Sequence, residues 1–159
     1  MAENEKKGSS IFDLASKLGN DLKRQLVGIN IPDVIKVIKE SGLTKRKYKD
    51  EKDAEAFIAK ALNEKFGGTH RQYNVGGYLG LKVDIDINEK IGIEIKLASQ
   101  MNSSAIERLF GQVIYYTKRK YNENLLVLVI GTKNEYTEII KEVERFVEDL
   151  DATFYYLEV

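Results

Sequence analysis

Residues 83–97 read VDIDINEKIGIEIKL, and charged and aliphatic side chains alternate along most of this stretch. Such alternation is typical of β-strands with one buried face. Two alternating runs, at 81–87 and 91–97, flank the turn residues Asn88-Glu89-Lys90. The stretch therefore predicts two antiparallel strands joined by a tight turn.

The register of this hairpin follows from the length of its loop. A three-residue loop pairs Ile87 with Ile91 and places Asp84 directly opposite Glu94. Because successive side chains of a strand point to opposite faces, the aliphatic set that begins at Val83 is expected on one face. The charged side chains expected to share the other face are Asp84, Asp86, Glu94 and Lys96.

The sequence around the hairpin predicts an α/β fold, in which helices flank a mixed β-sheet. Asp50, Ser104 and Thr132 are expected N-caps of amphipathic helices, and the last two are each followed three residues later by the glutamate of a capping box. The run NLLVLVIG is apolar throughout, as expected of a strand buried on both faces. In chain order, the expected elements are a helix closed by Gly67-Gly68, strands at 70–75, 81–87 and 91–97, a helix at 104–120, a strand at 124–131, a helix ending near Leu150 and a strand at 153–159.

The chain is expected to divide into three parts. Residues 1–10 are polar and predict a disordered tail. Residues 11–49 predict a small N-terminal helical extension with a basic linker, in which one short helix runs from Ile11 to Leu26 and Pro32 opens a second. Residues 50–159 hold the predicted α/β core.

The composition excludes several kinds of site. The 159 residues include no Cys and one His, which excludes disulfide scaffolds, thiolate metal sites and multi-histidine metal sites. No apolar run approaches the roughly 18 residues that a membrane span needs, so we expect a soluble, cytoplasmic protein with no membrane partner.

The net charge is zero, but the charges are unevenly distributed. Residues 1–82 hold 16 basic and 11 acidic side chains, whereas residues 83–159 hold 9 and 14. The neutral total therefore does not exclude a nucleic-acid partner, because the first half is basic.

The carboxylates of the hairpin point to a metal site. Two carboxylates within a few ångströms repel each other unless a cation neutralises them. A hard divalent ion such as Mg²⁺ or Mn²⁺ prefers oxygen ligands, and it can activate water for attack on a phosphodiester. Lys96, two residues after Glu94, would point to the same place and could stabilise the charge that develops on the phosphate.

The arrangement of Asp84 and Glu94-Ile95-Lys96 resembles the PD-(D/E)xK, or restriction-endonuclease-like, nuclease superfamily. The resemblance covers residues 50–159, and in size and layout it is greatest to archaeal Holliday-junction resolvases and small restriction-type endonucleases. It implies the element order α-β-β-β-α-β-α-β and a Mg²⁺-dependent endonuclease acting on DNA rather than RNA, often as a homodimer. Asp84 and Glu94 would bind the metal, Lys96 would assist the attacking water, and Glu55 would complete the metal site.

Several alternatives stay open. Val83, not proline, precedes Asp84; Asp86 competes with Asp84 as a ligand, and Glu51 competes with Glu55. The fold could also serve a nucleic-acid- or protein-binding module without cleavage activity, or the hairpin charges could be an ordinary solvated surface. Candidate contacts to substrate phosphate are Gln100, Arg108, Gln112 and Arg119, with the metal-bound water as a further partner for Gln112.

Overall fold

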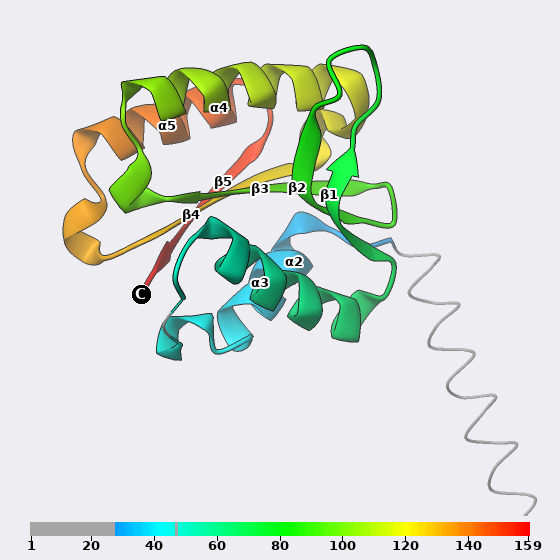
Figure 1. The fold of residues 1–159 in the computed structure, drawn as a ribbon, viewed down its shortest axis with the longest axis horizontal. Coiled ribbons are helices and arrows are strands. Elements are labelled where there is room, and N and C mark those ends of the chain that lie inside the picture. Colours follow the sequence, from blue (N-terminus) through cyan, green and yellow to red (C-terminus); the bar gives the residue numbers. More distant parts are fainter. Residues whose placement is uncertain (1–27, 47) are drawn as a thin grey trace, which may run out of the picture.

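The computed structural model describes residues 28–46 and 48–159, and its centre is a five-stranded mixed sheet in the order β1-β2-β3-β4-β5 (Figure 1). The expected α/β class is confirmed. The predicted tail and the predicted helix from Ile11 to Leu26 lie outside the described residues. The main elements are α2 (Ile31–Glu40), α3 (Glu51–Phe66), β1 (Thr69–Asn74), β2 (Lys82–Ile87), β3 (Ile91–Leu97), α4 (Ser103–Tyr116), β4 (Leu125–Gly131), α5 (Glu138–Asp149) and β5 (Thr153–Glu158).

The first three strands form an antiparallel meander, and β3, β4 and β5 are parallel. The β2–β3 register is the expected one, since Ile85 pairs with Ile93 and Ile87 with Ile91. The parallel connections pass through α4 and α5, as parallel strands require a crossover. All residues of β4 are buried, which confirms the prediction made from their continuous apolar run.

Helices cover both faces of the sheet (Figure 1). One core cluster joins α2 and α3 to the isoleucines of β2 and β3, and the other joins α4 and α5 to the opposite side chains of β4. Although α2 precedes the predicted core, Val34 and Ile38 are fully buried in the first cluster. Among the described residues, none of the helices is both long enough and apolar enough to span a membrane.

The helix ends follow local capping chemistry, with one correction. Asp50 caps α3 as expected, because its carboxylate accepts a hydrogen bond from the Asp53 backbone. The prediction of Ser104 as the cap of α4 is wrong: Asn102 caps this helix by accepting from the backbone N–H of Ala105. An asparagine two residues upstream competes for the same role, since both residue types favour N-caps.

The end of α4 and the start of α5 also differ from the expected boundaries. The α-helical part of α4 ends at Tyr116 and continues as a wider π-helical turn over Thr117–Tyr121. Thr132 and Glu135 do form a capping box, but on the short 3₁₀-helix Lys133–Glu135, and α5 begins at Glu138.

The side-chain alternation of β2 breaks at Asp84. Ile85 packs against the α3 face, whereas Val83 packs in the cluster beside α4. The expectation that Val83 shares a face with the isoleucines is therefore wrong. The register of β1 places Gln72 opposite Asp84, and Gln72 has a positive φ of 50°. Both strands switch faces at this position, because the left-handed backbone of Gln72 interrupts the regular pleat.

Candidate functional site

Asp84 and Glu94 approach each other where β2 separates from β3. The recorded β2–β3 pairing ends at Ile85, one residue before Asp84 would pair with Glu94. The carboxylate of Asp84 instead accepts a hydrogen bond from the backbone N–H of Ile95, at 2.7 Å. The break in the pleat thus turns Asp84 towards β3 rather than onto the face where the alternation placed it.

Lys96 lies against the buried glutamate. Its Nζ is 2.7 Å from Oε1 of Glu94, and the side chains of Lys96 and Glu94 are 13% and 1% exposed. The second carboxylate oxygen of Glu94, Oε2, is buried and has no hydrogen-bond partner among the described residues. A buried acceptor without a donor is costly, so this oxygen is the atom of the site best prepared to receive a cation.

Both glutamates at the start of α3 reach this region. Oε1 of Glu51 accepts from the backbone N–H of Leu97 at 3.4 Å, and Oε2 lies 4.0 Å from Nζ of Lys96. Glu55 is 2% exposed and is joined to Asp84 through Gln72, whose amide nitrogen lies 2.9 Å from Glu55 Oε2 and 3.1 Å from Asp84 Oδ1. Glu51 therefore borders the lysine, and Glu55 borders the aspartate.

Asp86 has a structural role. It is completely buried, and its two oxygens accept hydrogen bonds from Tyr121 Oη at 2.6 Å and from the backbone N–H of Glu89 at 2.8 Å. Gly92 leaves room for this arrangement, because a Cβ at that position would lie 2.6 Å from the Tyr121 ring. Asp86 does not join the group formed by Asp84, Glu94 and Lys96.

The electrostatics of the site reflect burial among like charges. Burial, and then the charge of Asp84, raise the pKa of Glu94 to about 8, although the Lys96 ammonium opposes the shift. Burial also raises the pKa of Asp84, against the influence of Lys96. Burial by itself lowers the pKa of Lys96, but Glu94 and Asp84 outweigh it, so the net shift is upward and Lys96 stays charged at neutral pH.

The residues fit a divalent cation in their chemistry, although their present arrangement is not a finished ligand set. Across residues 28–46 and 48–159, no three carboxylate or histidine side chains are gathered closely enough to hold a metal ion. The Lys96 ammonium and the Gln72 amide instead hold the carboxylates by ion pairing and hydrogen bonding. Mg²⁺ and Mn²⁺ prefer oxygen ligands, and the unpartnered carboxylate oxygen of Glu94 is such a ligand.

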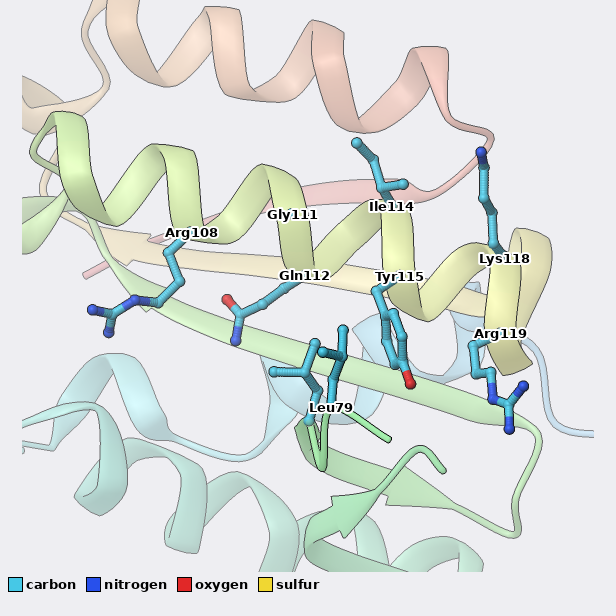
Figure 2. Close-up of a pocket in the computed structure, with 9 residues that line it drawn as sticks. Leu79, Arg108, Gly111, Gln112, Ile114, Tyr115, Lys118 and Arg119 are labelled. Atoms are coloured by element: carbon cyan, nitrogen blue, oxygen red, sulfur yellow. The ribbon is translucent and has the colours of Figure 1, made fainter. Parts of the chain in front are cut away.

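A groove lies beside these residues, between α4 and the β1–β2 loop. Its volume is about 540 Å³, and Arg108, Gln112 and Arg119, three of the four predicted substrate contacts, line it. Figure 2 shows Arg108, Gln112 and Tyr115 on α4 and Arg119 on the following π-helical turn, with Leu79 of the β1–β2 loop near Gln112 and Tyr115. The fourth predicted contact, Gln100, is exposed in the turn after β3 and does not line the groove.

Gln112 lines the groove and contacts Tyr116. Its amide lies 3.4 Å from Tyr116 Oη, and its own oxygen, Oε1, is buried without a partner among the described residues. Burial raises the pKa of Tyr116, and the charge of Glu94 raises it further, so Tyr116 lies within electrostatic range of Glu94. Tyr116 therefore lies between the groove residue Gln112 and the electrostatic influence of Glu94.

Sequence reasoning did not identify Gln72, Arg71 and Tyr116. Arg71 donates to Glu55 at 2.8 Å, and Tyr116 donates to the Lys82 carbonyl oxygen at 2.8 Å. For Arg71 and Gln72, the polar composition of THRQYN was the available signal, since five polar residues in six are unusual for a strand that packs beside a helix.

No protein-family model, no curated protein and no solved structure matches this chain.

Proposed function

We propose that the protein is a Mg²⁺- or Mn²⁺-dependent nuclease that hydrolyses phosphodiester bonds in DNA. The observation that carries the proposal is the meeting of Asp84, Glu94 and Lys96 where β2 and β3 separate, with one oxygen of Glu94 buried and unpartnered. The αβββαβ order from α3 to β4 supports the resemblance to PD-(D/E)xK nucleases. We therefore propose that this α/β fold is of the restriction-endonuclease-like type.

If a divalent ion binds at this site, it would supply Lewis-acid polarisation of the phosphodiester and activation of a water molecule. Asp84 and Glu94 would hold the ion through their carboxylate oxygens. Glu51, near Lys96, and Glu55, bonded to Gln72, are the additional carboxylates. Lys96 stays protonated and donates to a phosphate oxygen or to the attacking water, which lowers the energy of the charged transition state. Arg108 and Arg119 contact the backbone phosphates of the DNA.

The test is cleavage of labelled branched, duplex and single-stranded DNA, with RNA in parallel, in Mg²⁺ and in Mn²⁺. The wild type is expected to cut at least one DNA form, and Asp84→Ala is expected to abolish cleavage. Asp149→Ala, which alters an exposed carboxylate at the end of α5, is the matched control and should cut at the wild-type rate. Equal cleavage by the Asp84→Ala variant would overturn the site assignment.

A second candidate is a module of the same fold that binds nucleic acid without cutting it. The closed network in which Lys96 and Gln72 already occupy the carboxylates favours this alternative. Binding of DNA with no cleavage in either metal, at any pH between 6 and 9, would support it.

A further inference from the structure

The β1–β2 loop presents two apolar side chains to solvent. Residues 76–80 read GGYLG. Tyr78 is fully exposed and Leu79 is 68% exposed, the highest values among the large hydrophobic side chains of the described residues. Aromatic and aliphatic side chains that are adjacent and exposed commonly mark a binding surface, because leaving them in water is unfavourable.

The root of this loop is held in place. The backbone N–H of Val75 donates to the Leu81 carbonyl oxygen at 3.0 Å, and Tyr115 Oη donates to the Gly76 carbonyl oxygen at 2.6 Å. Gly77 has a φ of +83°, and a Cβ there would come within 2.2 Å of the Tyr115 hydroxyl. The glycines thus allow the loop to lie against α4, and Tyr78 projects from a root of defined position.

The groove next to this loop has the charge of an anion-binding surface. Leu79 and Leu81 of the loop line it together with Arg108, Gln112 and Arg119, and none of its lining residues is a carboxylate. Figure 2 shows Leu79 below the helix that carries Arg108 and Gln112. The groove is lined by apolar side chains, one tyrosine (Tyr115) and guanidinium groups, and the exposed Tyr78 adjoins Leu79 at its loop side. This combination matches a ligand that carries both flat rings and phosphates. A nucleotide chain has both, with the rings and phosphates separated by a sugar.

The geometry points to a single-stranded or unpaired nucleotide as the occupant, and we propose that Tyr78 and Leu79 pack against an unstacked base while Arg108 and Arg119 hold the adjoining phosphates. In a continuous duplex the base faces are already stacked and are closed to a side chain, so this contact selects DNA with a gap, fork or branch. The inference rests on the proposed function and adds the substrate class. Gln112 lines the groove, and its amide lies 3.4 Å from the hydroxyl oxygen of Tyr116.

The test measures binding in EDTA, so that no cleavage is required. Fluorescence anisotropy compares labelled gapped or forked DNA with continuous duplex of the same length, using wild type, Tyr78→Ala and the matched control Tyr78→Phe. Tyr78→Ala is expected to weaken binding to gapped or forked DNA about tenfold and to change duplex binding less than twofold. Tyr78→Phe should bind like wild type, because it keeps the ring. Since Tyr78 is fully exposed, unchanged thermal unfolding will establish that the variants are folded.

A second readout follows the base itself. With 2-aminopurine at the unpaired position, wild type should quench the fluorescence on binding and Tyr78→Ala should not. Equal weakening of both DNA forms, no weakening, or no DNA binding by wild type would overturn the inference. Tyr78-dependent binding to vesicles of phosphatidylglycerol and phosphatidylcholine, without DNA binding, would overturn it in favour of a membrane surface. Selective binding in EDTA with no cleavage in Mg²⁺ would contradict the proposed nuclease activity and leave the loop assignment standing.

Discussion

The burial of Glu94 predicts a stability that falls as pH rises. Below its ordinary pKa of 4.5, Glu94 is protonated in both the folded and the unfolded state, and the fold carries no penalty from it. As pH rises, the unfolded chain loses this proton first, whereas the folded protein keeps it up to about pH 8. The stability that comes from keeping Glu94 protonated is therefore complete below pH 4.5. It declines as pH rises and is fully lost once the pH has passed the folded pKa of about 8.

The magnitude follows from the shift. One pKa unit corresponds to about 1.4 kcal/mol, so between pH 5 and pH 8 the wild type should lose about 3 to 4 kcal/mol of unfolding free energy that Glu94→Gln does not lose. The raised pKa of Asp84 acts in the same direction, but Asp84 is present in both proteins. The comparison of the two pH profiles therefore isolates Glu94 and its coupling to Asp84.

The assay is urea unfolding followed by circular dichroism at pH 5, 6, 7 and 8 in EDTA, because the chain contains no tryptophan. Glu107→Gln changes an exposed glutamate of α4 and serves as the control whose profile should match that of the wild type. Parallel profiles for wild type and Glu94→Gln would refute the argument from burial. Adding Mg²⁺ at pH 8 should stabilise the wild type and leave Glu94→Gln unchanged, since a cation favours the carboxylate form.

The remaining predictions concern the contacts that support the site. Tyr121→Phe removes the donor to buried Asp86 and should lower the unfolding free energy by about 1 to 3 kcal/mol in urea titrations without reducing the DNA cleavage rate. Gly92→Ala should cost about 1 to 3 kcal/mol in the same titrations, because its Cβ would meet the Tyr121 ring; a neutral effect would contradict the packing described. Arg71→Ala, which removes the guanidinium from buried Glu55, should cost roughly 1 to 3 kcal/mol, and Arg71→Lys should restore part of it.

The sequence predicted those parts of the fold that depend on local patterns. The three-residue turn set the register of Ile85 and Ile87, and the apolar run of β4 predicted a strand buried on both faces. The Asp50 cap was likewise predictable, since its carboxylate acts on a backbone N–H three residues away. These features need only the periodicity and the chemistry of neighbouring residues.

The arrangement of the site depended on features that local patterns do not encode. A positive φ at Gln72 has no sequence signal, because glutamine rarely adopts this conformation. The hydrogen bond that Asp86 accepts from Tyr121, 35 residues away in the chain, is likewise a contact that no local pattern predicts. The sequence predicted that Glu55, with Glu51 as its rival, joins the site as a metal ligand; in the structure Glu51 lies near Lys96, and Glu55 is bonded to Gln72.

The single-turnover rate of DNA cleavage in Mg²⁺ measures whether Lys96 and the buried carboxylates carry out the proposed hydrolysis. Lys96→Ala should reduce this rate by about 10²- to 10³-fold, the effect typical of a lost group that stabilises transition-state charge. Lys90→Ala, in the exposed β2–β3 turn, is the matched control and should cleave at the wild-type rate. Cleavage by Lys96→Ala at the wild-type rate would contradict the account.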